Sequence, residues 1–312
     1  MRLDDHRFSD NVRDQRGQSF GGGGGGFGGG GGMFGLLFGL VLSRFGIGGV
    51  LLLGLGYCAM TMMSGTGGGG TGAVAPHQQS AARSGAAGAG AAGGSEAQQA
   101  CSKDEVSAFS CRVLASTEDT WGPIFAQRGE RYQPALFTFY GGRGQSGCGA
   151  AQSAMGPFYC PTDNSIYLDT SFFEELRTRF RAAGDFAQAY VIAHEVGHHI
   201  QQLTGVLDRA RREQRRLPAA EGNAVQVRVE LQADCYAGVW AGRNRERMEP
   251  GDLEEGMRAA EAIGDDTLQR EAQGRVSPES FTHGTAAQRM AWLRRGIETA
   301  DPARCDTFSG AV

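Results

Sequence analysis

Apolar residues recur in regular patterns through the last two thirds of the chain. After about residue 101 they return every three or four positions over several stretches, which is the spacing of helices with one buried face. In the first such stretch Val106, Phe109 and Val113 form one stripe. The spacing predicts helices over residues 104–127, 172–181, 222–245, 251–273 and 285–298, and a further helix that begins near Gly184.

Shorter apolar runs predict strands ahead of the helix near Gly184. Residues 135–140 are rich in aromatic side chains and end at a pair of glycines. Residues 156–160 and 165–169 flank Pro161-Thr162-Asp163-Asn164, a turn sequence that indicates a hairpin. We therefore expect an α+β domain that is mainly helical, with a small antiparallel sheet ahead of that helix.

Glycine dominates the chain before residue 101. Its tracts at 21–32 and 64–94 cannot form a packed core. No charged residue interrupts 45–63, which is long enough to cross a bilayer as a helix. We expect a disordered polar and glycine-rich head over residues 1–32, a membrane-spanning segment over 33–63 with its core at 45–63, a flexible linker over 64–100, and one domain over 101–312.

Basic residues predict how the apolar segment is oriented. Those that precede it are Arg2, Arg7, Arg13, Arg16 and Arg44, whereas the next one after it is Arg83. Positive charge before the segment indicates a cytoplasmic N-terminus. We expect a single-pass protein of the inner membrane, with the domain over 101–312 in the periplasm or outside the cell.

The cysteines fit the same topology. Of the seven, Cys58 lies in the apolar segment and the other six follow residue 100. An even number outside the membrane suggests disulfides in an oxidising compartment; reduced, buried thiols in a cytosolic domain are the alternative. Six cysteines allow fifteen pairings. The working hypothesis is Cys101–Cys111, Cys148–Cys160 and Cys235–Cys305.

Charge gives little sign of a special partner. The formal net charge is −4, so nothing suggests that the protein binds nucleic acid. The cationic run over 209–216 is expected to be a solvated helix face rather than a binding patch. The sequence predicts no particular oligomeric state.

Two histidines interrupt the apolar helix that begins near Gly184. His194 and His198 are four residues apart, so on a helix they share a face and can bind one tetrahedral zinc ion. Glu195 can reach a water bound to that metal and act as a general base. Two surface histidines spaced by chance are the alternative. Polar residues within an otherwise apolar run favour the metal interpretation.

A catalytic zinc site needs a third protein ligand. Glu230 is the best candidate, because it lies on the predicted helix over 222–245 and shares a face with Asp234 at i,i+4. Asp234 can accept the second ring N–H of a histidine ligand. A helix with surface salt bridges would also carry such carboxylates. The nearby HExxH motif favours ligation.

These motifs resemble the gluzincin branch of zinc metallopeptidases, in which the third ligand is a glutamate. More closely, the chain is similar to a bacterial membrane-anchored family of neutral zinc metallopeptidases. The similarity covers SDNVRDQRG (9–17), TEDTWGPIF (117–125), SGCGAAQSAMGPFYCPTDNSIYLD (146–169), GDFAQAYVIAHEVGHHIQ (184–201) and SFTHGTAAQRMAWLRRG (280–296). The resemblance implies a zincin-like fold, in which a strand ahead of the metal helix opens its edge to the substrate cleft.

The resemblance also implies a role for His283. The segment with His283 and Arg289 is similar to the T-H-P…R segment of related membrane zinc endopeptidases, where the histidine faces the metal and stabilises the oxyanion. Gly284 stands where those relatives often have proline. Capping of the helix that starts near Thr285 is the alternative role.

Together these features predict a zinc-dependent endopeptidase that acts on a peptide or protein substrate. Zn²⁺ is held by His194, His198 and Glu230, Glu195 is the general base, and His283 stabilises the oxyanion. One alternative is a non-catalytic, zinc-containing envelope protein that binds a partner. Another is hydrolysis of a non-peptide amide by the same site.

Overall fold

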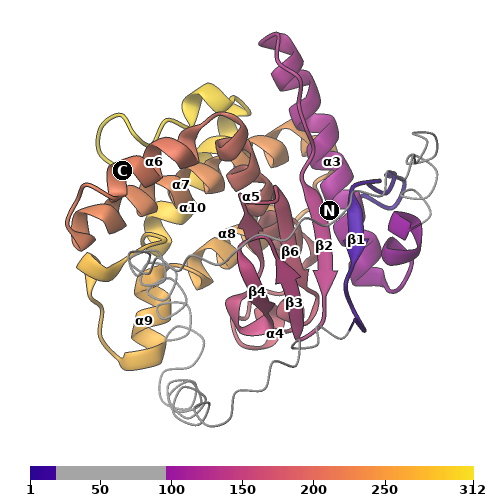
Figure 1. The fold of residues 1–312 in the computed structure, drawn as a ribbon, viewed down its shortest axis with the longest axis horizontal. Helices are drawn as coiled ribbons and strands as arrows, with labels where there is room; N and C mark the ends of the chain where they lie inside the picture. Colours follow the sequence, from indigo (N-terminus) through magenta and orange to yellow (C-terminus); the bar gives the residue numbers. More distant parts are fainter. Residues whose placement is uncertain (19–95) are drawn as a thin grey trace, which may run out of the picture.

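The computed structural model describes residues 1–18 and 96–312, which form a mainly helical α+β fold as expected. The helices are α3 (Glu105–Gln127), α4 (Ser171–Thr178), α5 (Asp185–Leu203), α6 (Val206–Gln214), α7 (Ala219–Arg243), α8 (Asp252–Ala262), α9 (Asp265–Gln273) and α10 (Ala286–Thr299). The strands are β1 (Val12–Asp14), β2 (Leu136–Tyr140), β3 (Arg143–Ser146), β4 (Gly149–Gln152), β5 (Phe158–Cys160) and β6 (Ser165–Asp169). Figure 1 shows α5 to α10 gathered on one side of the sheet strands and α3 beside β1 and β2.

The larger sheet is mixed, with strand order β1-β2-β6-β5. β5 and β6 form the predicted antiparallel hairpin, with Phe158 opposite Tyr167. β2 runs parallel to β6, because the chain passes through β3, β4 and β5 before it returns as β6. The expectation of a purely antiparallel sheet is therefore wrong. β3 and β4 form a separate antiparallel pair that the sequence did not predict.

Residues 1–18, which we call the N-terminal arm, belong to the folded body. β1 adds to the edge of the sheet parallel to β2. Leu3 is buried, and Glu118 on α3 accepts hydrogen bonds from Ser9 (2.5 Å) and Asn11 (2.9 Å). The expected disordered head is wrong for these residues. In Figure 1 the arm, in indigo, lies beside β2 and α3.

The first residue of the arm reaches the start of α5. The Met1 ammonium lies 2.7 Å from Oδ1 of Asp185 and 3.2 Å from Oδ1 of Asp252. Asp185 is the first residue of α5, and Asp252 is the first residue of α8. These contacts put the arm on the same body as the helix that carries His194 and His198.

The expected membrane topology needs correction. Within residues 1–18 and 96–312, no helix has both the length and the apolar character needed to cross a bilayer. The described residues therefore do not support the predicted N-terminal transmembrane helix or the predicted single-pass inner-membrane localisation. The segment 33–63 itself lies outside the described residues. The expected topology also put the arm and the domain on opposite sides of a membrane, which the contacts of Met1 and β1 do not allow.

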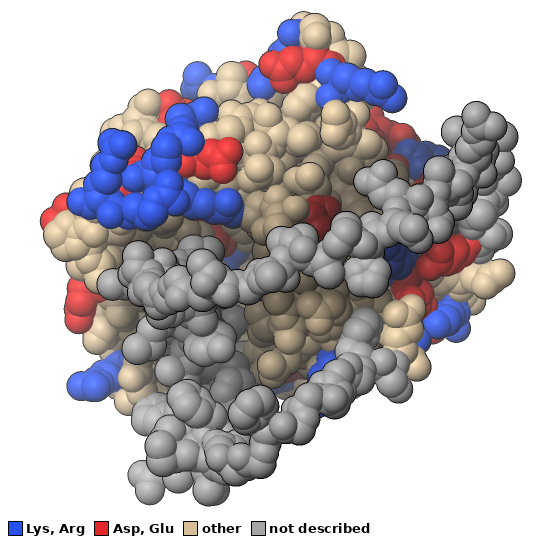
Figure 2. All heavy atoms as spheres, viewed as in Figure 1, with Lys and Arg blue, Asp and Glu red and all other residues tan. Residues whose placement is uncertain are grey.

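The cationic run of the sequence falls on α6 and the turn after it. Arg209, Arg211, Arg212, Arg215 and Arg216 are all exposed. Figure 2 shows their side chains as a blue area over the position of α6 in Figure 1. The expectation of a solvated face is confirmed as far as exposure is concerned.

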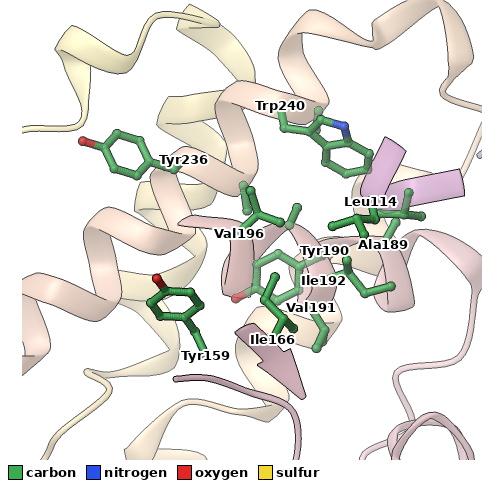
Figure 3. Packing of buried hydrophobic residues seen from close by; sticks show 14 of the residues in the cluster. Leu114, Tyr159, Ile166, Ala189, Tyr190, Val191, Ile192, Val196, Tyr236 and Trp240 are labelled. Carbon is green, nitrogen blue, oxygen red and sulfur yellow. The ribbon is translucent and has the colours of Figure 1, made fainter. Parts of the chain in front are cut away.

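The core surrounds α5. Figure 3 shows α5 side chains, among them Tyr190 and Val196, packed between Ile166 of β6, Leu114 of α3 and Trp240 of α7. All five side chains are almost fully buried. Truncation of such a residue to alanine typically costs about 2–5 kcal/mol. The apolar faces therefore fix the position of α5, and with it the histidines.

Three disulfides link the described residues: Cys101–Cys111, Cys148–Cys160 and Cys235–Cys305. These are the pairs of the working hypothesis, which is confirmed. The third joins α7 to the C-terminal segment across 70 residues. A loop of that length implies a stabilisation of about 4 kcal/mol in the chain-entropy account.

The predicted helix over 251–273 is two helices. α8 ends at Ala262, and α9 begins at Asp265. A Cβ added to Gly264 would lie 2.4 Å from the backbone nitrogen of Ala286, so the start of α10 packs directly against this break. The break turns the Asp265 carboxylate toward residues 282–284.

Candidate metal centre

α5 carries the HExxH residues through the core. Gly184 precedes it with φ 129°, a conformation that favours glycine. Glu255 accepts a hydrogen bond from the backbone nitrogen of Phe186 (3.2 Å), which satisfies one of the free N–H groups at the helix start. Further along, His194 and Glu195 are buried. Buried polar groups in a core helix need partners, and α7 supplies those of His194.

α7 crosses α5 at Gly197. A Cβ on Gly197 would lie 2.9 Å from the carbonyl oxygen of Ala233 and 3.0 Å from its Cα. Any side chain here would therefore force the two helices apart. The close contact brings Glu230 and Asp234 of α7 against the histidine face of α5.

Three ligand atoms meet at this crossing. Nε2 of His194 is 3.2 Å from Oε2 of Glu230, and Nε2 of His198 is 3.5 Å from the same oxygen. The three groups lie within 4.8 Å of one another. In a tetrahedral zinc site with bonds of about 2.0–2.1 Å, neighbouring ligand atoms are about 3.3 Å apart. Two imidazoles and a carboxylate at these distances fit a zinc ion with its fourth position open.

The electrostatics of the three groups also favour a cation between them. Burial would lower the pKa of His194, but Asp234 and Glu230 outweigh burial and raise it to about 9. Burial would raise the pKa of Glu230, but His198 and His194 hold it well below its usual range. Without a metal, a proton on His194 provides the positive charge that the carboxylate attracts. Zinc would take the place of that proton.

Asp234 fixes the orientation of His194. Its Oδ1 lies 2.8 Å from Nδ1 of His194 and accepts a hydrogen bond from the Tyr190 hydroxyl (2.6 Å). Arg289 on α10 donates to both carboxylate oxygens at 2.9 Å. Burial would raise the pKa of Asp234, but Arg289 and His194 lower it to about 2. An ionised Asp234 keeps the proton of His194 on Nδ1 and leaves Nε2 free to bind metal.

His198 has a neutral partner instead. Oε1 of the buried Gln201 lies 2.9 Å from Nδ1 of His198. Nε2 of Gln201 donates to the Val229 carbonyl (2.7 Å) and to Oε1 of Gln232 (3.1 Å). Gln232 in turn donates to the Cys305 carbonyl at 2.9 Å. Sequence reasoning missed these two glutamines; the signal was a glutamine three residues after His198 and another two residues after Glu230.

Glu195 follows His194 directly on α5, but among the described residues no other side chain forms a hydrogen bond with it. It is 8% exposed and makes no side-chain hydrogen bond within the part of the chain that the structure describes. Burial would lower the pKa of His198, but Glu230 and, more weakly, Glu195 raise it. The negative charge of Glu195 therefore acts on the His198 ring. A buried, unengaged carboxylate beside a metal site can exchange protons with a water there.

His283 is held near the ligands by Asp265. Oδ2 of Asp265 accepts hydrogen bonds from the backbone nitrogens of Thr282 and His283 at 2.6 Å, and its Oδ1 lies 3.3 Å from Nδ1 of His283. Burial would lower the pKa of His283, but Asp265 and Glu230 raise it. The next residue, Gly284, packs against α7, because a Cβ there would lie 3.3 Å from Cδ2 of Leu231, so the His283 loop lies beside the helix that carries Glu230. Sequence reasoning missed Asp265, because its role depends on the break between α8 and α9.

The loop after His283 departs from the segment that it resembles. Gly284 has φ 87°, which proline cannot adopt. Thr285 caps α10 through its own side chain, in a capping box with Gln288. Helix capping is therefore not the role of His283.

Comparison with known proteins covers nearly the whole chain. Residues 1–308 match the model of the family described as "Putative neutral zinc metallopeptidase". The chain is 43% identical to "Uncharacterized protein YpfJ" of Escherichia coli (strain K12) over 316 residues, which covers 100% of both. It is 44% identical to "Uncharacterized protein Rv2575" of Mycobacterium tuberculosis (strain ATCC 25618 / H37Rv) over 217 residues, or 64% of this chain and 71% of that protein. No solved structure matches the chain.

Proposed function

Because the chain belongs to the neutral zinc metallopeptidase family, we propose that it is a zinc-dependent endopeptidase. His194, His198 and Glu230 would hold the metal. The observation that carries the proposal is the meeting of two imidazole Nε2 atoms and one carboxylate oxygen at 3.2 and 3.5 Å. Two buried helices supply these atoms, which chance spacing of surface histidines would not produce.

Side chains of the protein would transfer a proton from the attacking water to the leaving nitrogen. Zinc held by His194, His198 and Glu230 would act as a Lewis acid that lowers the pKa of water to about 7 and polarises the scissile carbonyl. Glu195 accepts the proton of the attacking water and delivers it to the leaving nitrogen. Asp234 and Gln201 keep the ring protons of the two histidines on Nδ1, so the ligands take no part in this transfer.

His283 would stabilise the negative charge that develops on the carbonyl oxygen. Asp265 and Glu230 raise its pKa against the effect of burial, which favours the protonated ring. A protonated imidazole is a charged hydrogen-bond donor, the kind of group that stabilises an oxyanion. Oδ2 of Asp265 accepts hydrogen bonds from the backbone nitrogens of Thr282 and Gly284, the residues before and after His283.

A peptide substrate would bind along β5. This strand is at one end of the larger sheet and pairs with β6 on its other side. The Tyr159 hydroxyl of β5 is 3.1 Å from Nδ1 of His199 on α5, so the strand lies directly beside the metal helix. An extended peptide that pairs with this edge would be bound mainly through its backbone.

The substitution Glu195→Gln tests the proposal. It keeps the size of the side chain but removes its ability to accept a proton, so turnover of casein should fall by about 10²–10⁴-fold while zinc stays bound. Rates are measured on the full chain with and without chelator, and zinc is measured by elemental analysis. Glu221→Gln, at an exposed position of α7, is the matched control and should keep its activity.

Two results would contradict the proposal. Equal rates for Glu195→Gln and the parent chain would rule out Glu195 as the base. A zinc-loaded parent chain that cleaves neither casein nor a broad peptide mixture would instead favour a non-catalytic zinc protein that binds a partner. If the protein cleaved only non-peptide amides, the proposed metal mechanism would stand, but the substrate class would be different.

A further inference from the structure

The arginines of α6 form a charged surface that the proposed reaction does not use. We call Arg209, Arg211, Arg212, Arg215 and Arg216 the arginine face. All are exposed, and on the face seen in Figure 2 they form a continuous blue area. Among the described residues these five make one ion pair, between Arg211 and Asp208 at 3.9 Å. In a chain of net charge −4, this is a local excess of positive charge.

Part of the arginine face lines a hollow rather than a flat surface. Arg209, Arg212 and Arg216 surround an open hollow of about 420 Å³, together with Glu213 and Leu217. Guanidinium groups bind carboxylates through paired hydrogen bonds, and several of them around one hollow can bind more than one carboxylate. Leu217 offers an apolar contact for the methylene groups of such side chains. The hollow therefore fits aspartate or glutamate side chains of a peptide.

The arginine face lies next to the metal centre. Gln214, at the end of α6, donates to Oε1 of Gln226 at 3.0 Å, and Gln226 donates to Oε1 of Glu230 at 2.9 Å. The end of α6 is thus two hydrogen bonds from a proposed metal ligand. Burial raises the pKa of Tyr159 on β5, and Arg211 partly offsets this effect, so its charge is also felt at the strand where a peptide would pair.

We propose that the arginine face recruits acidic segments of protein substrates to the metal centre. The proposal rests on the proposed endopeptidase function and names a substrate class for it. A peptide paired with β5 would lie within reach of the Arg211 charge, and that charge would attract an acidic flank toward the guanidinium groups. Attraction of this kind mainly raises the rate of encounter, and it is screened by salt.

An anionic lipid surface is the less favoured partner. Lipid-binding surfaces usually combine basic residues with exposed apolar side chains that insert among the acyl chains. Within residues 1–18 and 96–312 the exposed large apolar residues are Leu253 and Phe308, and neither belongs to the arginine face. Glu213, in the wall of the hollow, would also repel a uniformly negative sheet of headgroups.

The test uses two labelled peptides with the same central sequence, a segment of casein. One is flanked by four glutamates on each side, and the other by four glutamines. Binding to the full-length Glu195→Gln chain is measured by fluorescence anisotropy, and kcat/KM is measured with the parent chain. At low ionic strength we expect the acidic peptide to be favoured by about 10-fold in both, with the preference lost in 0.5 M NaCl.

Two charge-reversal variants make the comparison specific. Arg209→Glu/Arg212→Glu/Arg216→Glu should lose or reverse the acidic preference and keep the parent kcat/KM for the glutamine peptide. The matched control is Arg258→Glu/Arg275→Glu/Arg294→Glu, at exposed arginines outside α6. It makes the same change in net charge and should keep the preference.

The outcomes separate this proposal from the proposed function. Equal binding of the two peptides, or an acidic preference that survives in the Arg209/Arg212/Arg216 variant, overturns the role of the arginine face. Binding with the expected preference but without hydrolysis by the parent chain overturns the endopeptidase function and leaves the arginine face as a binding surface. Binding to phosphatidylglycerol vesicles that depends on these arginines, without an acidic-peptide preference, overturns it in favour of a lipid surface.

Discussion

His194 and His198 hold equivalent positions in the HExxH motif but have different partners. The Nδ1 of His194 faces a buried carboxylate that two further groups stabilise, whereas the Nδ1 of His198 faces a neutral amide. A carboxylate partner makes a ligand more basic than an amide partner does. The two histidines should therefore contribute unequally to zinc affinity. Sequence spacing predicted both ligands and the acceptor role of Asp234, but not this difference, because the partner of His198 depends on how α5 and α7 pack.

Gln201 provides a direct test of the neutral partner. Gln201→Met removes the acceptor for the His198 ring proton and should lower zinc affinity by about 10–100-fold. Gln202→Met is the control, since Oε1 of Gln202 has no hydrogen-bond partner among the described residues. Zinc affinities are compared by chelator competition. Equal affinities for the two variants would remove Gln201 from the metal centre.

Zinc binding should release a proton from His194. In the metal-free protein its pKa is raised to about 9, so the ring is protonated at pH 7 and must lose that proton to bind zinc. The stabilisation that this proton gives the metal-free fold is full below pH 6.5 and is lost as the pH rises through 9. Zinc affinity should therefore increase with pH up to about 9. Calorimetry in buffers of different ionisation enthalpy measures the release; no buffer dependence at pH 7 would contradict it.

At the scale of elements, the metal centre depends on how closely α5 and α7 approach. The helices themselves were predictable, because their apolar spacing is regular. The break between α8 and α9 was not predictable from that spacing. It arises where α10 packs against Gly264, a contact between segments far apart in the chain. The parallel pairing of β2 with β6 likewise depends on the path of the chain and not on local pattern.

Two glycine substitutions with opposite expected signs test this crossing. Gly197→Ala places a methyl group 2.9 Å from the Ala233 carbonyl oxygen and should destabilise the fold by about 1–3 kcal/mol, with weaker zinc binding. Gly222→Ala on α7 meets its nearest atom, the carbonyl oxygen of Gln214, at an ordinary 3.7 Å and should stabilise the fold by up to about 1 kcal/mol. Denaturant unfolding and chelator competition report both effects. Unchanged zinc affinity in a folded Gly197→Ala protein would show that the close approach is not needed.

At the scale of the whole molecule, the N-terminal arm is where the structure differs most from the sequence-based prediction. Its few apolar residues, such as Leu3 and Val12, follow no helical or alternating pattern, so sequence reasoning assigned it to a disordered head. The structure completes the sheet with β1 and ties Met1 to the start of α5. Its stability comes from contacts with segments more than 100 residues away, such as Glu118, which no local pattern encodes. The family match from residue 1 covers the arm as well as the metal motifs.

X-ray absorption at the zinc edge, combined with metal analysis of the purified full-length chain, tests the central claim most directly. The account predicts one zinc per chain with nitrogen and oxygen ligands at about 2.0–2.1 Å, two of them imidazoles, and loss of most of the zinc in Glu230→Ala. Sulfur ligands at about 2.3 Å, or full zinc content in Glu230→Ala, would contradict it.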